Sequence, residues 1–195
     1  MHFTLCDMFS DLTQNAIEAG ARVITVNLEE TPERLTFSVR DNGKGMSPEK
    51  LHQATDPFYT DGIKHPGRKI GLGIPFLIQT AESTGGTWNI RSETAESTIG
   101  AKCEAGTIVD CSFDLTNIDT PPVGDVTGYF RQVLSFDGDY EMIISRTKKS
   151  AKDIQIEYTV SRSELLEALG LSEEGSFVDA SSLALLATYL NSMEE

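Results

Sequence analysis

The sequence predicts a protein of mixed α and β structure, built as one domain of moderate size with an appendage. Residues 4–19 carry apolar side chains at helical spacing, whereas residues 23–28 and 35–40 alternate apolar and polar side chains as strands do. Residues 107–115 alternate in the same way. With 195 residues and 39% hydrophobic side chains, the chain can bury a sizeable core.

The composition narrows the function classes. Lys and Arg number 16 and Asp and Glu number 30, so the formal net charge is −14, which argues against non-specific binding to nucleic acid or to an anionic membrane. Backbone amides and a few Lys side chains can still form a local phosphate pocket. Cys6, Cys103 and Cys111 form no CxxC pair and suit reduced, buried thiols. No apolar run approaches the ~20 residues that span a bilayer, and no signal peptide is evident, so we expect a cytoplasmic protein without a membrane partner.

The first predicted helix covers residues 4–19 and ends at Gly20. Asp11 and Asn15 are four residues apart and therefore share a helical face beside the apolar stripe. The pair has two interpretations. It is either a solvated polar pair, or a metal and water site in which the Asn amide oxygen binds Mg²⁺ and Asp11 accepts a proton.

The predicted hairpin delivers an acidic residue to the inward face of a strand. The apolar side chains of residues 35–40 share one face, and Asp41 continues that face. Gly43 and Gly45 follow and allow a sharp turn and close approach of a ligand. A carboxylate at the rim of an apolar core can accept a hydrogen bond from an exocyclic amine. An ordinary Asp-Asn-Gly turn is the alternative.

A short helix is predicted from Pro48 to about residue 54, with Ser47 as its N-cap. The loop that follows, residues 55–70, is predicted to be mobile from its Pro and Gly content. Gly71, Leu72 and Gly73 then lead into an apolar helix at 76–83. Free amides at a helix start attract anions. With Arg68 and Lys69 alongside, a phosphate is the expected ligand.

Two further strands are predicted on either side of a polar loop at residues 92–106. Trp88 and Ile90 are expected to point inward from residues 87–91. Thr107 opens the strand 107–115 and faces the core side, as Asp41 does. Two polar groups facing one apolar interior indicate a ligand between them, although a Thr bonded to the backbone is an equal alternative.

A boundary is expected at residues 119–122, where Pro121 and Pro122 interrupt the pattern. Beyond it the spacing predicts a helix at 126–136, strands at 140–146 and 154–160, a helix that ends at Gly170 and a last helix at 179–193. This region contains no chemical motif.

Five segments together resemble the sequence boxes of the GHKL ATPase superfamily, which includes DNA gyrase B, heat-shock chaperone ATPases, histidine kinases and MutL. They are residues 11–20 (DLTQNAIEAG), 41–46 (DNGKGM), 56–60 (DPFYT), 71–75 (GLGIP) and 106–107 (GT). Their order and spacing match the family across residues 3–116.

The resemblance implies an α+β two-layer sandwich of the Bergerat type, with helices on one face of a mixed sheet. It implies an ATP-binding domain at residues 1–118 and a small α/β C-terminal extension at 119–195. By similarity, Asp41 accepts the adenine amino group and Asn15 holds Mg²⁺. The other residues that the resemblance assigns to ATP binding are Gly43, Gly45, Met46, Lys69, Gly71, Leu72, Gly73 and Thr107.

The chain departs from the family at Asp11, where hydrolytic members carry Glu as the catalytic base. Since His2 lies at the N-terminus of this sequence, we do not expect self-phosphorylation on a helical hairpin, and we expect no downstream domain of the gyrase or MutL type. Two functions are expected: an ATP–Mg²⁺-binding regulatory protein whose lid loop, residues 56–70, is ordered by nucleotide, or a protein kinase of the anti-sigma or histidine-kinase type that acts on a separate partner protein. A degenerate structural module without ATP is the remaining alternative.

Overall fold

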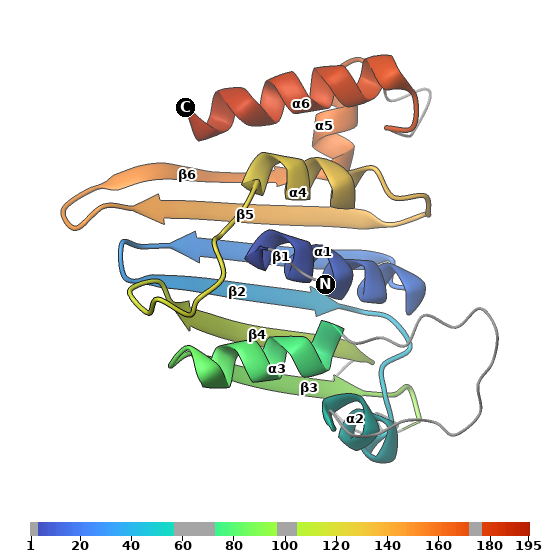
Figure 1. Ribbon diagram of the computed structural model, residues 1–195. Coiled ribbons are helices and arrows are strands. Elements are labelled where there is room, and N and C mark those ends of the chain that lie inside the picture. The colour runs from blue at the N-terminus through green and yellow to red at the C-terminus, as the bar shows by residue number, and fades with distance from the viewer. Residues whose placement is uncertain (1–3, 57–72, 97–104, 172–176) are drawn as a thin grey trace.

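A six-stranded mixed sheet runs through the computed structural model, which describes residues 4–56, 73–96, 105–171 and 177–195. The strand order is β3-β4-β2-β1-β5-β6 (Figure 1). Within these residues every neighbouring pair is antiparallel except β1 and β5, which are parallel. The strands are β1 Val23–Glu30, β2 Arg34–Asp41, β3 Thr87–Glu93, β4 Gly106–Asp114, β5 Glu141–Lys149 and β6 Ile154–Ser161.

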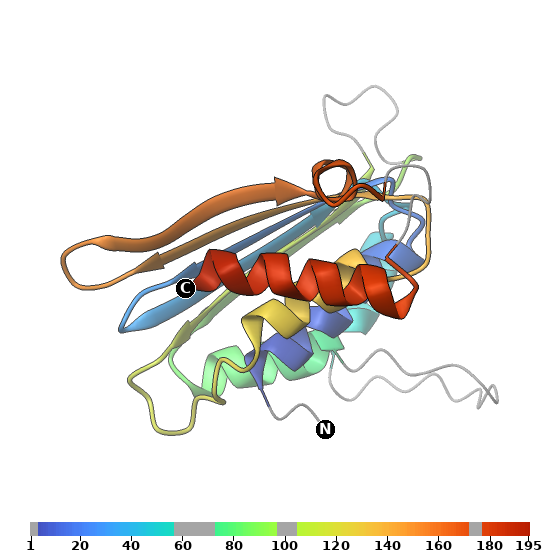
Figure 2. The ribbon, with the colours of Figure 1, turned by 90° about the horizontal axis from the view of Figure 1, so that it is seen from above.

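The helices form a second layer. Figure 2 shows α1, α3, α4 and α6 together on one face of the sheet, which confirms the predicted α+β two-layer sandwich. None of the helices in the described parts of the chain is long and apolar enough to cross a bilayer. The helices are α1 Leu5–Glu18, α2 Pro48–Thr55, α3 Gly73–Ser83, α4 Val126–Leu134, α5 Arg162–Ala168 and α6 Ala180–Glu194.

Helix α1 lies at the centre of the helical layer, between α3 and α4 (Figure 1). Thr4 caps it through a capping box with Asp7, which satisfies free amides of the first turn. Its Phe9 ring stacks on Phe37 of β2 with 4.1 Å between ring centroids. The predicted apolar stripe of α1 and the inward faces of β1 and β2 are therefore buried together, as the alternation of the sequence indicates.

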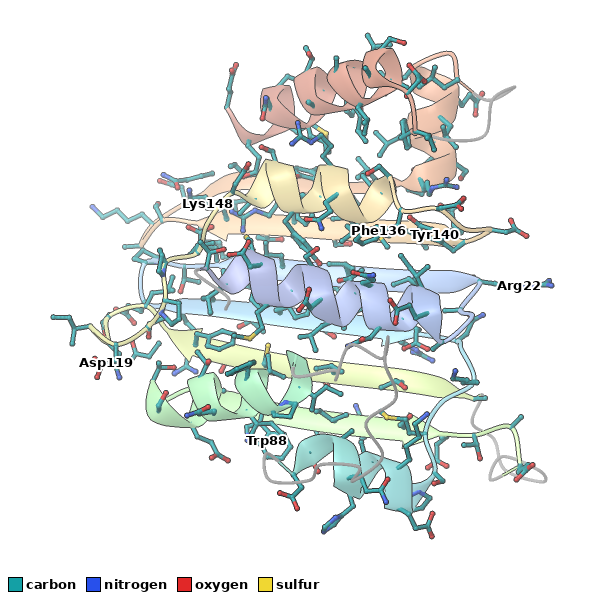
Figure 3. The ribbon with its side chains drawn as sticks, turned by 45° about the vertical axis from the view of Figure 1, so that its right-hand side comes forward. Arg22, Trp88, Asp119, Phe136, Tyr140 and Lys148 are labelled. Carbon is teal, nitrogen blue, oxygen red and sulfur yellow. The ribbon has the colours of Figure 1, made fainter. Side chains whose placement is uncertain are left out.

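Strand β3 is an edge strand, and this limits the burial of its inward residues. Trp88 pairs with Cys111 of β4 and so faces the helices, yet it is 37% exposed because no strand flanks its other side in the described sheet (Figure 3). Its indole N–H donates to Glu82 of α3 at 3.0 Å. Ile90 is only half-buried. Trp88 therefore faces inward as predicted, but the edge position leaves it part-exposed.

The chain after residue 118 continues the same sheet. β5 pairs along the whole of β1, and the backbone amides of Leu5 and Cys6 donate to the carbonyls of Pro122 and Val123. The helices and strands predicted beyond residue 119 are present with shifts of a few residues. The division between residues 118 and 119 stays a prediction about domain organisation.

A buried arginine ties the last helix to the sheet. Arg146 of β5 is 1% exposed and pairs with Glu30 of β1 and with Glu194 of α6. The Arg146 Nε to Glu194 Oε1 distance is 3.2 Å, and the Tyr158 hydroxyl donates to the same carboxylate oxygen at 2.8 Å. The network joins β1, β5, β6 and α6 at one end of the molecule.

Replacing Arg146 with Met should lower the free energy of unfolding by about 3 kcal/mol, because Glu194 then loses its cation and Glu30 keeps only Lys148, at 3.6 Å. Arg91→Met is the matched control, since Arg91 pairs with Asp110 at 3.8 Å on the exposed surface. The control should cost less than about 1 kcal/mol. Urea unfolding monitored by circular dichroism measures both, and equal losses would show that the network does not stabilise the fold.

Candidate functional site

The site is centred on Asp41, the last residue of β2. Its Oδ1 accepts a hydrogen bond from the Gly43 amide at 2.8 Å. Burial raises the pKa of the Asp41 carboxyl, and the backbone amides of Gly43 and Thr107 partly offset this effect. Asp41 is half-buried at the rim of the core. It can therefore accept a hydrogen bond from a donor on a ligand.

The turn after Asp41 is fixed against the C-terminal end of α1. The Asn42 side-chain oxygen accepts from the amides of Arg22 and Val23 at 2.9 Å each, and the Lys44 amide donates to the Ala19 carbonyl at 3.1 Å. A Cβ on Gly43 would lie 2.9 Å from the Ala19 Cβ. Only glycine allows this close approach of the turn to the helix.

Gly45 brings the same turn against the end of β3. Its φ is +65°, and a side chain here would overlap the carbonyl of Glu93. The next amide, that of Met46, donates to the Ser92 hydroxyl at 2.8 Å. The sharp turn predicted at Gly45 is present, and it requires glycine because of the positive φ and the nearby Glu93 carbonyl.

Three polar side chains lie side by side across three neighbouring strands. Ser92 of β3 is the register partner of Thr107 of β4, which is the register partner of Asp41 of β2. The Ser92 and Thr107 hydroxyls are 2.8 Å apart, and Ser92 Oγ lies 3.2 Å from the Gly106 carbonyl oxygen. We call Asp41, Thr107 and Ser92 the polar row.

Sequence reasoning missed Ser92 because it assigned residues 92–106 to a loop. The signal was present. Ser92 follows Trp88 and Ile90 with a period of two, so extending the strand by one inward position places it on the same face. It then occupies a strand end, as Asp41 and Thr107 do.

A second group of predicted residues lies on α1. Asp11 and Asn15 are exposed and one turn apart, and Ala19, which contacts the Asp41 turn, is one turn further along the same face. Gly73 opens α3 and lies against them: a Cβ there would be 3.6 Å from the Asp11 Cβ and 3.8 Å from the Asn15 Nδ2. Helix α3 therefore begins three residues before the predicted start at residue 76.

The structure thus brings Gly73 together with Asp11 and Asn15, and Thr107 together with Asp41. Lys69, Gly71 and Leu72 lie outside the described residues, as does the predicted lid loop apart from Asp56.

The side chains near Asn15 suit a magnesium ion that is held mainly by a nucleotide. They suit a metal held by protein side chains alone less well. The described residues contain no group of three or more His, Cys, Asp or Glu side chains arranged for a metal. Mg²⁺ commonly takes only one or two protein ligands and completes its shell with phosphate and water. An exposed Asn15 beside the start of α3 suits that arrangement.

The two described cysteines belong to the core. Cys6 and Cys111 are buried and free. Burial raises the pKa of Cys6 to about 12 and raises that of Cys111 as well. Both pack in the hydrophobic core, and the raised pKa favours the thiol over the thiolate.

Parts of the chain are similar in sequence to known sensor and sporulation kinases. Over 97 residues the chain is 33% identical to sporulation kinase C of Bacillus subtilis, a match that covers 49% of this chain and 22% of that protein. Over 70 residues it is 36% identical to the CAI-1 autoinducer sensor kinase/phosphatase CqsS of Vibrio cholerae, covering 36% of this chain and 10% of that one. The chain therefore spans less than a quarter of the length of these relatives.

A solved structure shares the fold. The N-terminal domain of a DNA repair protein superposes with a TM-score of 0.51 and 16% identity, over 80% of this chain and 53% of that one. At this identity the likeness concerns the fold alone.

The family model for histidine kinase-, DNA gyrase B- and HSP90-like ATPases matches residues 3–117, which is more than half of the 195 residues. The resemblance seen in the sequence boxes is confirmed, and the protein belongs to this GHKL family of ATPase domains.

Proposed function

We propose that the protein binds ATP with Mg²⁺ at this site and acts as a nucleotide-dependent regulatory protein. The observation that carries the proposal is the half-buried Asp41 carboxylate, held at a strand end by the Gly43 amide and next to Thr107. An acceptor fixed in this way selects a ligand that presents a donor, such as the adenine amino group.

The remaining predicted residues have complementary roles in this proposal. Gly43, Gly45 and Met46 shape the adenine end, and Asn15 is the protein ligand of Mg²⁺. The backbone amides of Gly71, Leu72 and Gly73, together with Lys69, meet the phosphates, as free amides at a helix start do. When bound, ATP supplies a phosphoryl group whose charge Mg²⁺ offsets.

The response to nucleotide is assigned to the loop at residues 56–70. In this proposal ATP orders the loop, and the ordered loop or the C-terminal extension contacts a partner protein. The proposal includes no binding to nucleic acid or to a membrane, in line with the net charge of −14.

Phosphoryl transfer to a separate protein is the second candidate. The similarity to sporulation kinase C over 97 residues favours it. Asp11 is then the group that accepts a proton from the attacking hydroxyl or water. It lies on α1 beside Gly73, at the start of α3. The two candidates differ in the fate of ATP. The regulatory protein needs only to bind ATP, whereas the second candidate transfers its phosphoryl group.

Asp41→Asn should weaken ATP binding about 10-fold to 100-fold and remove any preference for ATP over GTP, because an acceptor that hydrogen-bonds as an anion is replaced by a neutral amide. Calorimetric titration with Mg²⁺ present measures both affinities. Asp119→Asn is the matched control, because Asp119 is exposed and lies at the opposite end of the sheet from Arg22, whose backbone contacts the Asp41 turn (Figure 3). Equal affinity of the wild type for ATP and GTP would contradict the role of Asp41.

Asp11→Ala should leave the ATP dissociation constant nearly unchanged and lower any phosphate release or transfer by about 100-fold or more, the usual contribution of a general base. Asp11→Glu should raise hydrolysis if the shorter side chain limits its reach. Glu18→Ala removes an exposed acid from the same helix and should change neither quantity. Labelled ATP followed by phosphate and protein analysis provides the measurement, and unchanged turnover in Asp11→Ala would exclude Asp11 as the base.

A further inference from the structure

We infer that Tyr129 is a positioning residue that holds helix α1, and with it Asp11 and Asn15, in place against α3. Tyr129 belongs to α4, outside the residues 3–117 that match the family. The inference rests on the proposed function, in which Asn15 is the protein ligand of Mg²⁺.

Helix α1 presents different side chains to its two neighbours in the helical layer. It lies between α3 and α4 (Figure 1). Asp11 and Asn15 lie against Gly73, the first residue of α3. Thr13 is about 200° around the helix from each of them, and its hydroxyl contacts Tyr129 of α4. The side of α1 that α4 holds is therefore opposite the side that carries the candidate site.

Thr13 and Tyr129 form a hydrogen bond inside the core. The two hydroxyl oxygens are 2.9 Å apart, and both residues are buried. The Thr13 hydroxyl donates its one proton to the Phe9 carbonyl at 2.8 Å, so it is the acceptor in its contact with Tyr129. Burial raises the pKa of the Tyr129 phenol above its ordinary value, so the phenol keeps the proton that it donates.

Aromatic neighbours fix the ring of Tyr129. It lies edge-on to the rings of Phe9 and Phe37, with centroid distances of 6.2 and 6.4 Å, and its centroid is 5.2 Å from that of Phe130. These distances are within the range that aromatic pairs favour. Because Phe37 belongs to β2, the position of the phenol is set by the sheet as well as by the helices. A rotation of α1 about its own axis would carry Thr13 away from this fixed donor.

The other polar links between α1 and the segment before α4 lie at the start of the helix. The amides of Leu5 and Cys6 donate to the carbonyls of Pro122 and Val123. Thr13 is about two turns further along, level with the candidate site. Loss of the Tyr129 hydroxyl would therefore leave the first turn anchored and loosen the part of α1 that carries the site.

The experiment compares Tyr129→Phe, which removes the hydroxyl and keeps the ring, with a matched control, Tyr140→Phe. Tyr140 is also buried, but its hydroxyl donates to the Val133 carbonyl at 2.6 Å and to the Phe136 carbonyl at 3.1 Å rather than to α1. Thr13→Ser is the conservative variant, because it keeps an acceptor oxygen at the same position.

Two quantities are measured. Amide hydrogen exchange of residues 13–18, followed by NMR in the ligand-free protein, reports how firmly α1 is held. Calorimetric titration with ATP, in the presence of Mg²⁺ and again with the metal chelated, gives the factor by which Mg²⁺ increases the affinity. This second factor depends on where Asn15 lies, and a general loss of stability would not change it.

In Tyr129→Phe the exchange of residues 13–18 should rise about threefold to tenfold, and the Mg²⁺ factor should fall by about the same amount, because one hydrogen bond contributes an effect of this size. The affinity for ATP without Mg²⁺ should stay unchanged. Tyr140→Phe should change neither quantity by more than about twofold, and Thr13→Ser should stay close to the wild type.

A Mg²⁺ factor as large in Tyr129→Phe as in the wild type would overturn this inference and leave the proposed function standing. Equal exchange in Tyr129→Phe and Tyr140→Phe would also overturn it, because the hydroxyl would then contribute only general stability. A wild type that binds no ATP, or binds it equally well without Mg²⁺, would overturn the proposed function and this inference with it.

Discussion

The packing of α1 across β1 and β2 is the constraint on which the rest of the structure depends. One side of the helix is buried through the stack of Phe9 on Phe37. Its adjacent exposed face carries Asp11 and Asn15, and its C-terminal end receives the turn that contains Gly43. A shift of the helix along the sheet would therefore disturb the core and the candidate site together. The Thr4 capping box and the backbone bonds to Pro122 and Val123 oppose such a shift.

Much of the fold could be predicted because its signals are local. Alternation at residues 35–40 placed Asp41 on the inward face of its strand, and helical spacing placed Asp11 and Asn15 one turn apart. Such patterns depend on neighbours only a few residues away. That Asp41 and Thr107 are register partners depends on the pairing of β2 with β4, which such local patterns do not predict.

The features that could not be predicted depend on contacts between distant segments. Trp88 is part-exposed because β3 is an edge strand, a property of the strand order that alternation does not carry. Arg146 is buried because Glu30 and Glu194 converge on it from opposite parts of the chain. Ser92 was overlooked because a serine at a strand end resembles a loop residue until its partners are known. In each case the missing information was which elements are neighbours in space.

The parallel pairing of β5 with β1 has a consequence for any shortened form of this protein. The family match ends at residue 117, yet β1 uses both of its sides for backbone hydrogen bonds, one with β2 and one with β5. A chain cut at the end of the match would leave one row of β1 amides and carbonyls without partners, and such uncovered strands promote self-association. The apolar surface of α1 that α4 covers would become exposed as well. The segment after residue 118 thus covers β1 and α1 within the same chain.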